Sequence, residues 1–251
     1  MTANFNNNYS RYYDLLYKDK DYEREAAYVA RQVRSIKPKA KSLLELGSGT
    51  ANHASLLCKE GFTITGIERS EEMAKESERK EIPGFTPLVA DISLFEAGQK
   101  FDGAIALFHV LSYLTTNESL ISCFETTHRH LNKEGLFMFD VWYTPAVYFQ
   151  KPETRIKKME NEDWDITRLA EAEILYNENV VNVNYEIILR NKATSQTEIY
   201  KEKHPMRHFS IPEIGFLARS TGFKMLKAEE FQTGNTPGPG TWGVCFILQK
   251  Q

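Results

Sequence analysis

The sequence is poor in cysteine and has no long apolar run. Its three cysteines, Cys58, Cys123 and Cys245, are far apart and flanked by apolar residues, so we interpret them as small buried side chains. This spacing argues against a disulfide framework or a zinc site, and no metal is expected. No apolar stretch reaches the roughly 18 residues of a membrane span, and residues 1–10 are polar and Asn-rich, unlike a signal peptide. We therefore expect a cytoplasmic chain with no membrane partner.

A strong excess of charge of either sign is also absent. The chain has 31 Lys and Arg residues against 34 Asp and Glu residues, a formal net charge of −3 and a pI near 6.1. Proteins that bind nucleic acid usually carry a basic face, so no nucleic-acid partner is expected. With 251 residues, 41% of them hydrophobic, the chain is long enough for one core and an additional cap.

An apolar run followed by two closely spaced glycines predicts a strand, a tight loop and a helix over residues 43–53. Gly47 and Gly49 permit backbone angles closed to other residues, and the helix start offers N–H groups to a polar ligand. A dinucleotide fingerprint needs Gly or Ala where Asn52 stands, which disfavours NAD, and the lysine of a phosphate-binding P-loop is absent. Glu45, inside the predicted strand, suits the ammonium of an amino-acid-like ligand better than a pyrophosphate.

Residues 45–51, Glu-Leu-Gly-Ser-Gly-Thr-Ala, resemble the first motif of the class I S-adenosylmethionine-dependent methyltransferases, E/D-x-G-x-G-x-G, with Ala51 in place of the last glycine. The resemblance covers most of the chain through further segments in the family's order. It implies an α/β fold, with a Rossmann-like seven-stranded methyltransferase sheet, an N-terminal helical lid and an antiparallel β cap insertion. It also implies S-adenosylmethionine as the cofactor.

Acidic residues at two predicted strand ends are expected to hold the adenosine. Glu68 follows the predicted strand 62–67, at the distance from the glycine loop where ribose hydroxyls need an acceptor. Asp91, after a strand through residues 88–89, resembles the family's acceptor for the adenine amino group, although an acid there is also a common helix cap. Met73 is expected against the adenine or else in the core. The residues expected to bind the cofactor are Tyr13, Tyr22, Glu45, Gly47, Ser48, Gly49, Thr50, Ala51, His53, Glu68, Arg69, Met73, Asp91, Ile92, Leu107 and Phe108.

A nearly continuous apolar stretch over residues 101–108 predicts a central strand buried on both faces, and His109 follows it. Because the carboxyl ends of strands line the ligand crevice of an open parallel sheet, His109 is expected to point toward the transferred methyl group and to act as a catalytic base. A structural role for this histidine is the alternative. The Asn/Asp-Pro-Pro-aromatic motif of methyltransferases that act on nucleobase amines is absent, in agreement with the low charge.

The N-terminal segment, residues 9–36, has aromatic and apolar residues at helical spacing and predicts two amphipathic helices. Its tyrosines either pack against the sheet or form a lid. The segment resembles the lid of methyltransferases that act on amino groups of nucleotide-linked deoxysugars, where such tyrosines close over the cofactor and the substrate. That resemblance implies catalytic positions for Tyr13 and Tyr17, and aromatic faces also attract a sulfonium cation.

A change of pattern after the fifth predicted strand of the core indicates an inserted cap. Residues 181–189 alternate between apolar and polar side chains, as in a half-buried strand, and turn-like segments flank them. We therefore expect a lid at 1–36, a core at 37–144 and 204–251, and a cap at 145–203 that resembles the substrate cap of small-molecule methyltransferases. The residues expected to contact the substrate are Trp142, Tyr143, Arg207 and His208.

The favoured hypothesis is a methyltransferase for a small molecule, with the amino group of a nucleotide-linked sugar as the first candidate acceptor. No Lys or Arg lies between Lys227 and Lys250, so Arg155, Lys203 or Arg207 would have to meet a diphosphate. The alternatives are N- or O-methylation of another small metabolite, and binding of S-adenosylmethionine without turnover. The sequence is also compatible with a homodimer.

Overall fold

The computed structural model describes residues 17, 18 and 20–251. Tyr13 and most of the first predicted N-terminal helix lie outside the described residues. The second predicted helix is confirmed as α2 (Tyr22–Ile36), which begins where the side chain of Asp21 accepts from the N–H of Arg24 at 2.9 Å. The lid expected from the sequence is therefore described only in its second half.

Helices connect the strands of the core and begin at polar capping residues. The side chain of Ser70 accepts from the N–H of Met73, and Ser210 forms a capping box with Glu213. Within the described residues, none of the helices is long and apolar enough to cross a membrane. After α2, the helical elements are α3 (Asn52–Lys59), α4 (Glu71–Arg79), the 3-10 turn η1 (Val110–Tyr113), α5 (Asn117–Arg129), α6 (Thr144–Gln150) and α7 (Ile211–Ser220).

The core sheet is parallel at its centre and antiparallel at one edge. Its strands are β1 (Ser42–Leu46), β2 (Thr63–Glu68), β3 (Phe85–Val89), β4 (Phe101–Ala106), β5 (Leu131–Tyr143), β10 (Phe223–Glu230) and β11 (Gly243–Lys250). The parallel strands lie in the order β3-β2-β1-β4-β5; β11 then pairs antiparallel with β5, and β10 with β11. This is the Rossmann-like α/β arrangement expected from the sequence.

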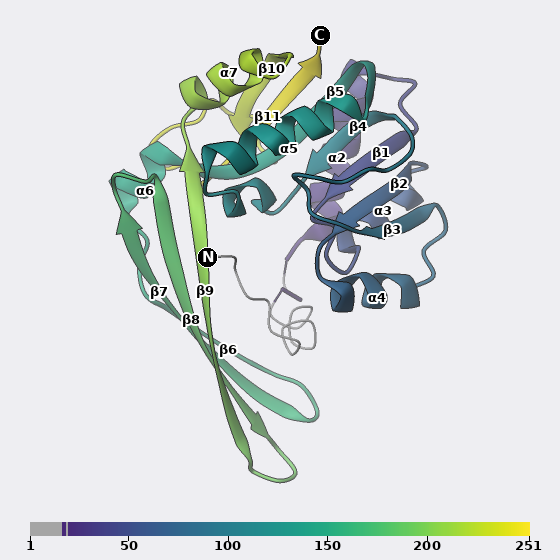
Figure 1. The fold of residues 1–251 in the computed structure, drawn as a ribbon. Helices are drawn as coiled ribbons and strands as arrows, with labels where there is room; N and C mark the ends of the chain where they lie inside the picture. Colours follow the sequence, from purple (N-terminus) through teal and green to yellow (C-terminus); the bar gives the residue numbers. More distant parts are fainter. Residues whose placement is uncertain (1–16, 19) are drawn as a thin grey trace.

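The strands are apolar because helices cover both faces of the sheet, as Figure 1 shows. Along β1, Leu43 packs in the cluster that contains residues of α2 and α3, whereas Leu44 packs in the cluster that contains residues of α5 and α7. Successive strand residues point to opposite faces, so both faces of a central strand must be hydrophobic. The helices leave the carboxyl ends of the parallel strands uncovered, and polar residues lie at that edge of the sheet.

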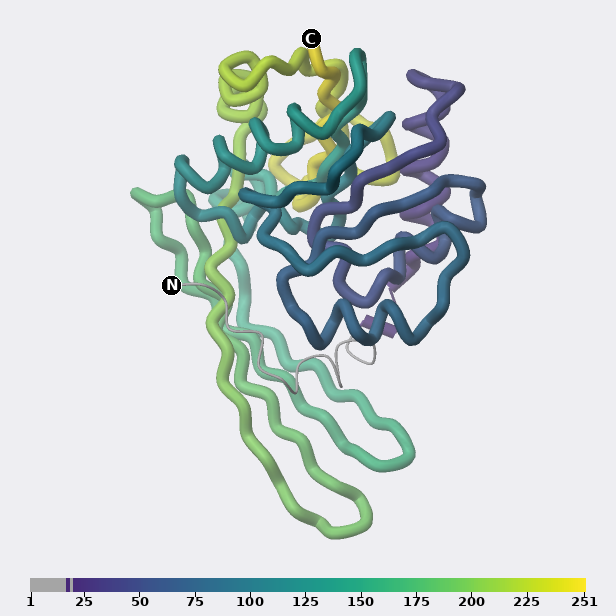
Figure 2. The backbone as a smooth tube through the Cα atoms, turned by 45° about the vertical axis from the view of Figure 1, so that its right-hand side comes forward, coloured from purple at the N-terminus to yellow at the C-terminus, as the bar shows by residue number. Residues whose placement is uncertain are grey.

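The residues after α6 form an antiparallel cap. Its strands are β6 (Arg155–Glu160), β7 (Trp164–Leu175), β8 (Val180–Asn191) and β9 (Thr197–Phe209). Figures 1 and 2 show them as long hairpins that extend beyond the core sheet. β9 ends beside β5, where Trp142 pairs with His208 and Tyr143 with Phe209. The strand therefore runs through the cap boundary expected at residue 203 and joins the core sheet directly.

Gly66 on β2 allows the glycine loop to pack against the sheet. A Cβ atom there would lie 2.6 Å from Oγ of Ser48 and 2.7 Å from the ring of Phe85. We expect Gly66→Ala to lower the free energy of unfolding by about 1–3 kcal/mol through overpacking, measured by urea unfolding. Gly238→Ala is the matched control, because nothing lies within 4 Å of the added atom. An equal loss of stability in both variants would contradict the packing argument.

Candidate active site

The glycine loop between β1 and α3 packs against the turn that follows β4. Gly47 has a φ angle of +67°, and a Cβ atom on it would lie 2.7 Å from both Cγ atoms of Val110, the first residue of η1. The backbone angle and the close approach both require glycine here. Ala51 is fully buried with a φ angle of +64°, so the loop keeps a left-handed backbone at the position where the family motif has its last glycine.

Glu68, at the end of β2, connects the loop to the start of α4. Its Oε2 atom accepts from the N–H of Gly49 at 2.9 Å, and its Oε1 atom accepts from the N–H of Ser70 at 2.8 Å. Burial raises the pKa of this carboxyl above its usual range, while the two N–H groups oppose the shift. The hydrogen bonds fix the carboxyl group beside the loop, and its role as a ribose acceptor stays a prediction.

A cavity of about 240 Å³ lies between the carboxyl ends of the strands and the cap. Most of the expected cofactor residues line it, and Tyr17, His109 and Trp142 line it with them. The sheet thus brings together residues that are far apart in the sequence. The expected cofactor residues in the wall are Tyr22, Gly47, Ser48, Gly49, Thr50, His53, Glu68, Arg69, Met73, Asp91, Ile92, Leu107 and Phe108.

The cavity wall also contains residues that the sequence analysis did not single out. Tyr113 comes from η1, Tyr185 from β8, and His204 and Met206 from β9. For the residues of β8 and β9, the sequence signal that could have indicated them was the alternation of apolar and polar side chains along the cap strands, because every second residue of a strand points to the same face. That alternation predicts which residues share a face, but which face meets the core depends on how the cap docks.

Arg207 and His208 do not line the cavity, and this corrects their expected role as substrate contacts. Nη2 of Arg207 donates to Oε1 of Glu213 at 2.7 Å and to Oδ1 of Asn117 at 2.9 Å, on the side of β9 away from Met206. His208 is fully buried, with Nδ1 2.9 Å from Oγ1 of Thr144, and burial lowers its pKa to about 4. Both side chains connect the end of the cap to the helices of the core.

Glu45 and Tyr143 also lie outside the cavity wall. Glu45 is 2% exposed, and its Oε1 atom lies 4.0 Å from Nδ1 of His53, which does line the cavity. Burial, and then the nearby Glu68, raise the pKa of Glu45 to about 8. Any effect of Glu45 on a bound ammonium therefore has to pass through His53. Tyr143 lies at the start of α6, and its N–H donates to the carbonyl of Trp242 at 3.0 Å.

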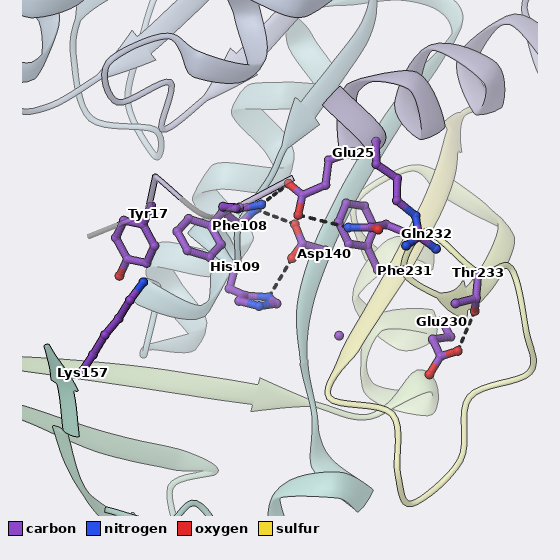
Figure 3. Close-up of a pocket in the computed structure, with 13 residues that line it drawn as sticks. Tyr17, Glu25, Phe108, His109, Asp140, Lys157, Glu230, Phe231, Gln232 and Thr233 are labelled. Atoms are coloured by element: carbon purple, nitrogen blue, oxygen red, sulfur yellow. Dashed lines mark hydrogen bonds and ion pairs between the residues drawn. The ribbon is translucent and has the colours of Figure 1, made fainter. Parts of the chain in front are cut away.

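Asp140, a buried residue of β5, holds the turn that carries His109. Its Oδ2 atom lies 2.7 Å from Nδ1 of His109, and its Oδ1 atom accepts from the N–H of Phe108 at 2.7 Å (Figure 3). Phe108 and His109 both have left-handed backbones, with φ angles of +65° and +62°. Burial alone would raise the pKa of Asp140, but the adjoining His109 lowers it below its usual range. The carboxylate stays charged and leaves Nε2 as the ring nitrogen that His109 offers to a ligand.

A second, open cleft of about 680 Å³ adjoins the cavity and shares His109 with it. Basic side chains reach this cleft from separate elements: Lys20 before α2, Arg24 in α2 and Lys157 in β6. Figure 3 shows Lys157 extending from the cap toward Tyr17. His109 therefore lies where the cavity meets a larger, open cleft, whose wall carries the acids Glu25, Asp140 and Glu230 as well as these basic side chains.

Glu25 of α2 links the cleft to the cavity. It pairs with Lys20, its Oε2 atom lies 2.7 Å from Nε2 of His53, and its Oε1 atom accepts from Nε2 of Gln232 at 3.2 Å. Burial would raise the pKa of Glu25, but the contacts with His53 and Lys20 lower it below its usual value. One charged carboxylate thus connects the start of α2, the helix after the glycine loop and the C-terminal loop.

The residues in the cavity fit S-adenosylmethionine, the cofactor expected from the sequence. The loop exposes backbone at Gly47 and Gly49, and the buried Oγ atom of Ser48 has no hydrogen-bond partner among the described residues. Glu68 supplies carboxylate oxygens, and Met73 supplies an apolar surface beside them. S-adenosylmethionine has a polar ribose, a flat adenine and a charged amino-acid end. Binding it requires this combination of hydrogen-bond donors, acceptors and apolar contact.

The sequence of the chain is similar to those of known methyltransferases. A family model described as a methyltransferase domain matches residues 19–228. The chain is 35% identical over 138 residues to the dTDP-3-amino-3,4,6-trideoxy-alpha-D-glucopyranose N,N-dimethyltransferase of Streptomyces venezuelae. That match covers 54% of this chain and 58% of the relative, so the chain spans little more than half of the relative's length.

Solved structures share the fold over nearly the whole chain. Streptomyces venezuelae DesVI has a TM-score of 0.80 at 23% identity, with 96% of this chain and 98% of that chain covered. CalS10 from Micromonospora echinaspora, described as an amino pentose methyltransferase with bound SAM, has a TM-score of 0.77 at 20% identity, with 95% and 96% covered. These two likenesses show the fold.

A substitution at Gly49 tests the location of the cofactor. Gly49 has a φ angle of +54°, and only Sδ of Met73, at 4.0 Å, approaches an added Cβ atom. Asp tolerates this backbone angle, so Gly49→Asp should stay folded while its carboxylate fills the space beside Glu68. We expect the affinity for S-adenosylhomocysteine to fall at least about tenfold, measured by calorimetric titration. The control Gly238→Asp should bind as the wild type does; unchanged affinity in Gly49→Asp would mean that the cofactor binds elsewhere.

The raised pKa of Glu45 makes the stability depend on pH. The folded chain keeps a proton on Glu45 up to about pH 8, whereas the unfolded chain loses it near 4.5. Between these values the unfolded state binds fewer protons, so this group lowers the free energy of unfolding as the pH rises. Glu45→Gln removes that dependence and should become more stable relative to the wild type from about pH 5 to pH 8. Parallel stability curves in urea unfolding would show that Glu45 is charged in the folded chain.

Proposed function

This chain belongs to the family of methyltransferase domains, and from that premise we propose that it transfers a methyl group from S-adenosylmethionine to an amino group of a nucleotide-linked sugar. The family match confirms the enzyme family and the methyl donor expected from the sequence. Support for the sugar comes from a relative whose name gives a dTDP-linked amino sugar as its substrate, and from the amino pentose methyltransferase among the similar structures.

When bound, S-adenosylmethionine supplies a methyl group already activated by its sulfonium, so the chain has mainly to position the acceptor. In this proposal Glu68 holds the ribose, Asp91 holds the adenine amino group, and the loop 47–49 holds the amino-acid end. Tyr17 and Tyr22 line the same cavity, where their rings attract a cation.

The observation that carries the acceptor assignment is the open cleft beside the cavity, which has basic side chains in its wall alongside three acids. A nucleotide-linked sugar combines a small sugar with a larger anionic part, which suits a small cavity that opens into a wider cleft where basic side chains can meet the phosphates. Arg207, one of the residues expected to meet a diphosphate, is engaged by Glu213. Lys157 and Arg24 bring positive charge to the cleft instead, from the cap and from α2.

His109 is the residue proposed to contact the acceptor where the two spaces meet. Asp140 fixes its ring through Nδ1, so Nε2 is oriented toward the bound sugar. The ring of Trp142, 6.2 Å from that of His109 between centroids, adds an apolar wall to the cavity. An apolar wall and a cationic donor both lower the pKa of a bound amine, which favours the neutral form that can attack the methyl group.

Turnover of paired acceptors tests this function. The full chain is supplied with S-adenosylmethionine and either dTDP-3-amino-3,4,6-trideoxyglucose or the same amino sugar without its nucleotide, and S-adenosylhomocysteine formation is followed. We expect kcat/KM to be at least about tenfold higher for the nucleotide-linked sugar. Equal turnover of both would remove the nucleotide from the proposal. Binding of S-adenosylmethionine with no turnover of any amine would contradict the function itself.

Lys157 tests the role of the cleft. Lys157→Ala should weaken binding of dTDP about tenfold, because a charge-assisted contact with a phosphate is lost, while affinity for S-adenosylhomocysteine stays unchanged. Lys158→Ala is the matched control, since the next strand residue points to the opposite face and is exposed. Calorimetric titration measures both ligands. Equal losses in the two variants would show that the cleft does not bind the nucleotide.

A further inference from the structure

A chain of hydrogen bonds leads from the cavity into the cap. Tyr113 and His204 both line the cavity, and Oη of Tyr113 lies 3.0 Å from Nδ1 of His204. Nε2 of His204 in turn lies 3.0 Å from Oε2 of Glu202. The side chains of His204 and Glu202 are 2% and 1% exposed, so the far end of this chain is closed to solvent.

The direction of these hydrogen bonds follows from the carboxylate at their end. A carboxylate can only accept, so Nε2 of His204 donates to Glu202. A neutral imidazole then has its lone pair on Nδ1, which accepts the O–H of Tyr113. Burial, with Tyr17 and Tyr185 nearby, raises the pKa of Tyr113 well above its usual range and keeps the proton on its oxygen. Tyr113, which lines the cavity, therefore gives its own proton to His204.

The carboxylate of Glu202 can stabilise a positive charge that forms on the His204 ring during the reaction. Glu202 is in direct contact with the imidazole, and the Cζ atom of Arg168 lies 4.9 Å from the ring centroid of Tyr185, which in turn contacts His204. The titratable and charged groups near Tyr113 on the neighbouring elements are Tyr17 before α2, Arg69 after β2 and Tyr185 on β8, whose ring also contacts Arg168 of β7.

We propose that Tyr113, His204 and Glu202 form the proton relay that deprotonates the acceptor amine, an inference that rests on the proposed function. The ammonium N–H bond breaks as an O–H bond forms on Tyr113, and the phenol's own proton moves to Nδ1 of His204. The electron pair stays on the amine nitrogen, which then attacks the methyl group. The positive charge ends on an imidazolium paired with Glu202. The proton returns through Tyr113 to water when the products leave.

The relay differs from the pair formed by His109 and Asp140. The side chain of His109 is 23% exposed and borders the open cleft, whereas that of His204 is 2% exposed. In the relay, the buried ring of His204 exchanges protons with the cavity through Tyr113. The relay therefore removes the proton, and His109 contacts the sugar.

Two variants test the relay through the pH dependence of kcat, measured with the amino sugar that the wild type methylates. His204→Asn keeps a hydrogen-bond acceptor for Tyr113 but cannot take up a proton, and Tyr113→Phe removes the oxygen. We expect each to lower kcat about 100-fold at pH values below the pKa of the bound amine, and the loss to disappear above that pKa, where no base is needed. His109→Asn should lower kcat at every pH. Recovery at high pH in His109→Asn instead of His204→Asn would overturn the relay.

His208→Asn is the matched control, because it makes the same change on the same strand at a buried histidine outside the cavity. It should keep the pH profile of the wild type. A measurement independent of the acceptor is the ¹⁵N spectrum of His204 in the full chain with S-adenosylhomocysteine, assigned by its loss in His204→Asn. Protonated Nε2 and unprotonated Nδ1 are expected; a proton on Nδ1 of the resting protein overturns the relay. A wild type that methylates none of the amino sugars overturns the proposed function and leaves this spectrum as the test of the relay.

Discussion

The arrangement of the site depends on one buried carboxylate, that of Asp140. It accepts from the N–H of Phe108 and pairs with His109, and so compensates two consecutive left-handed residues, each of which costs about 1–2 kcal/mol. This turn sets the start of η1, which places Val110 over Gly47 and Tyr113 beside the cap. The glycine loop, His109 and the cap are therefore all linked to the carboxylate of Asp140 through this turn.

Much of the fold could be predicted from the sequence because its signals are local. The glycine loop, the apolar run before His109 and the acid at the end of β2 each fix a strand end within a few residues, and the structure brings them to one cavity. The turn at Phe108 and His109 could not be predicted, because its left-handed angles depend on Asp140, 32 residues away. Ala51 likewise adopts an angle that its residue type disfavours, since the surrounding loop determines it.

The cap shows a different limit. Its period-two alternation correctly predicts strands, but not which residues meet the substrate side, because docking of a sheet is a long-range event. Arg207 has the chemistry of a phosphate ligand, yet it pairs with Glu213 beneath α7. Met206, the preceding residue, lies in the cavity wall. If the pairing register of β9 shifted by one residue, Arg207 would point to the cavity and Met206 away from it. The sequence alone does not fix that register.

The cap meets the core sheet through two residue pairs, Trp142 with His208 and Tyr143 with Phe209. The side chains that close the cavity from this side, such as Tyr185 and His204, belong to β8 and β9, whereas the glycine loop and Glu68 belong to the core. In the proposed function, donor and acceptor are thus bound by separate stretches of sequence that mutation can alter one at a time. In a lineage of such enzymes, new acceptors can arise by changes to hairpins while the ancestral machinery for the shared donor is inherited intact.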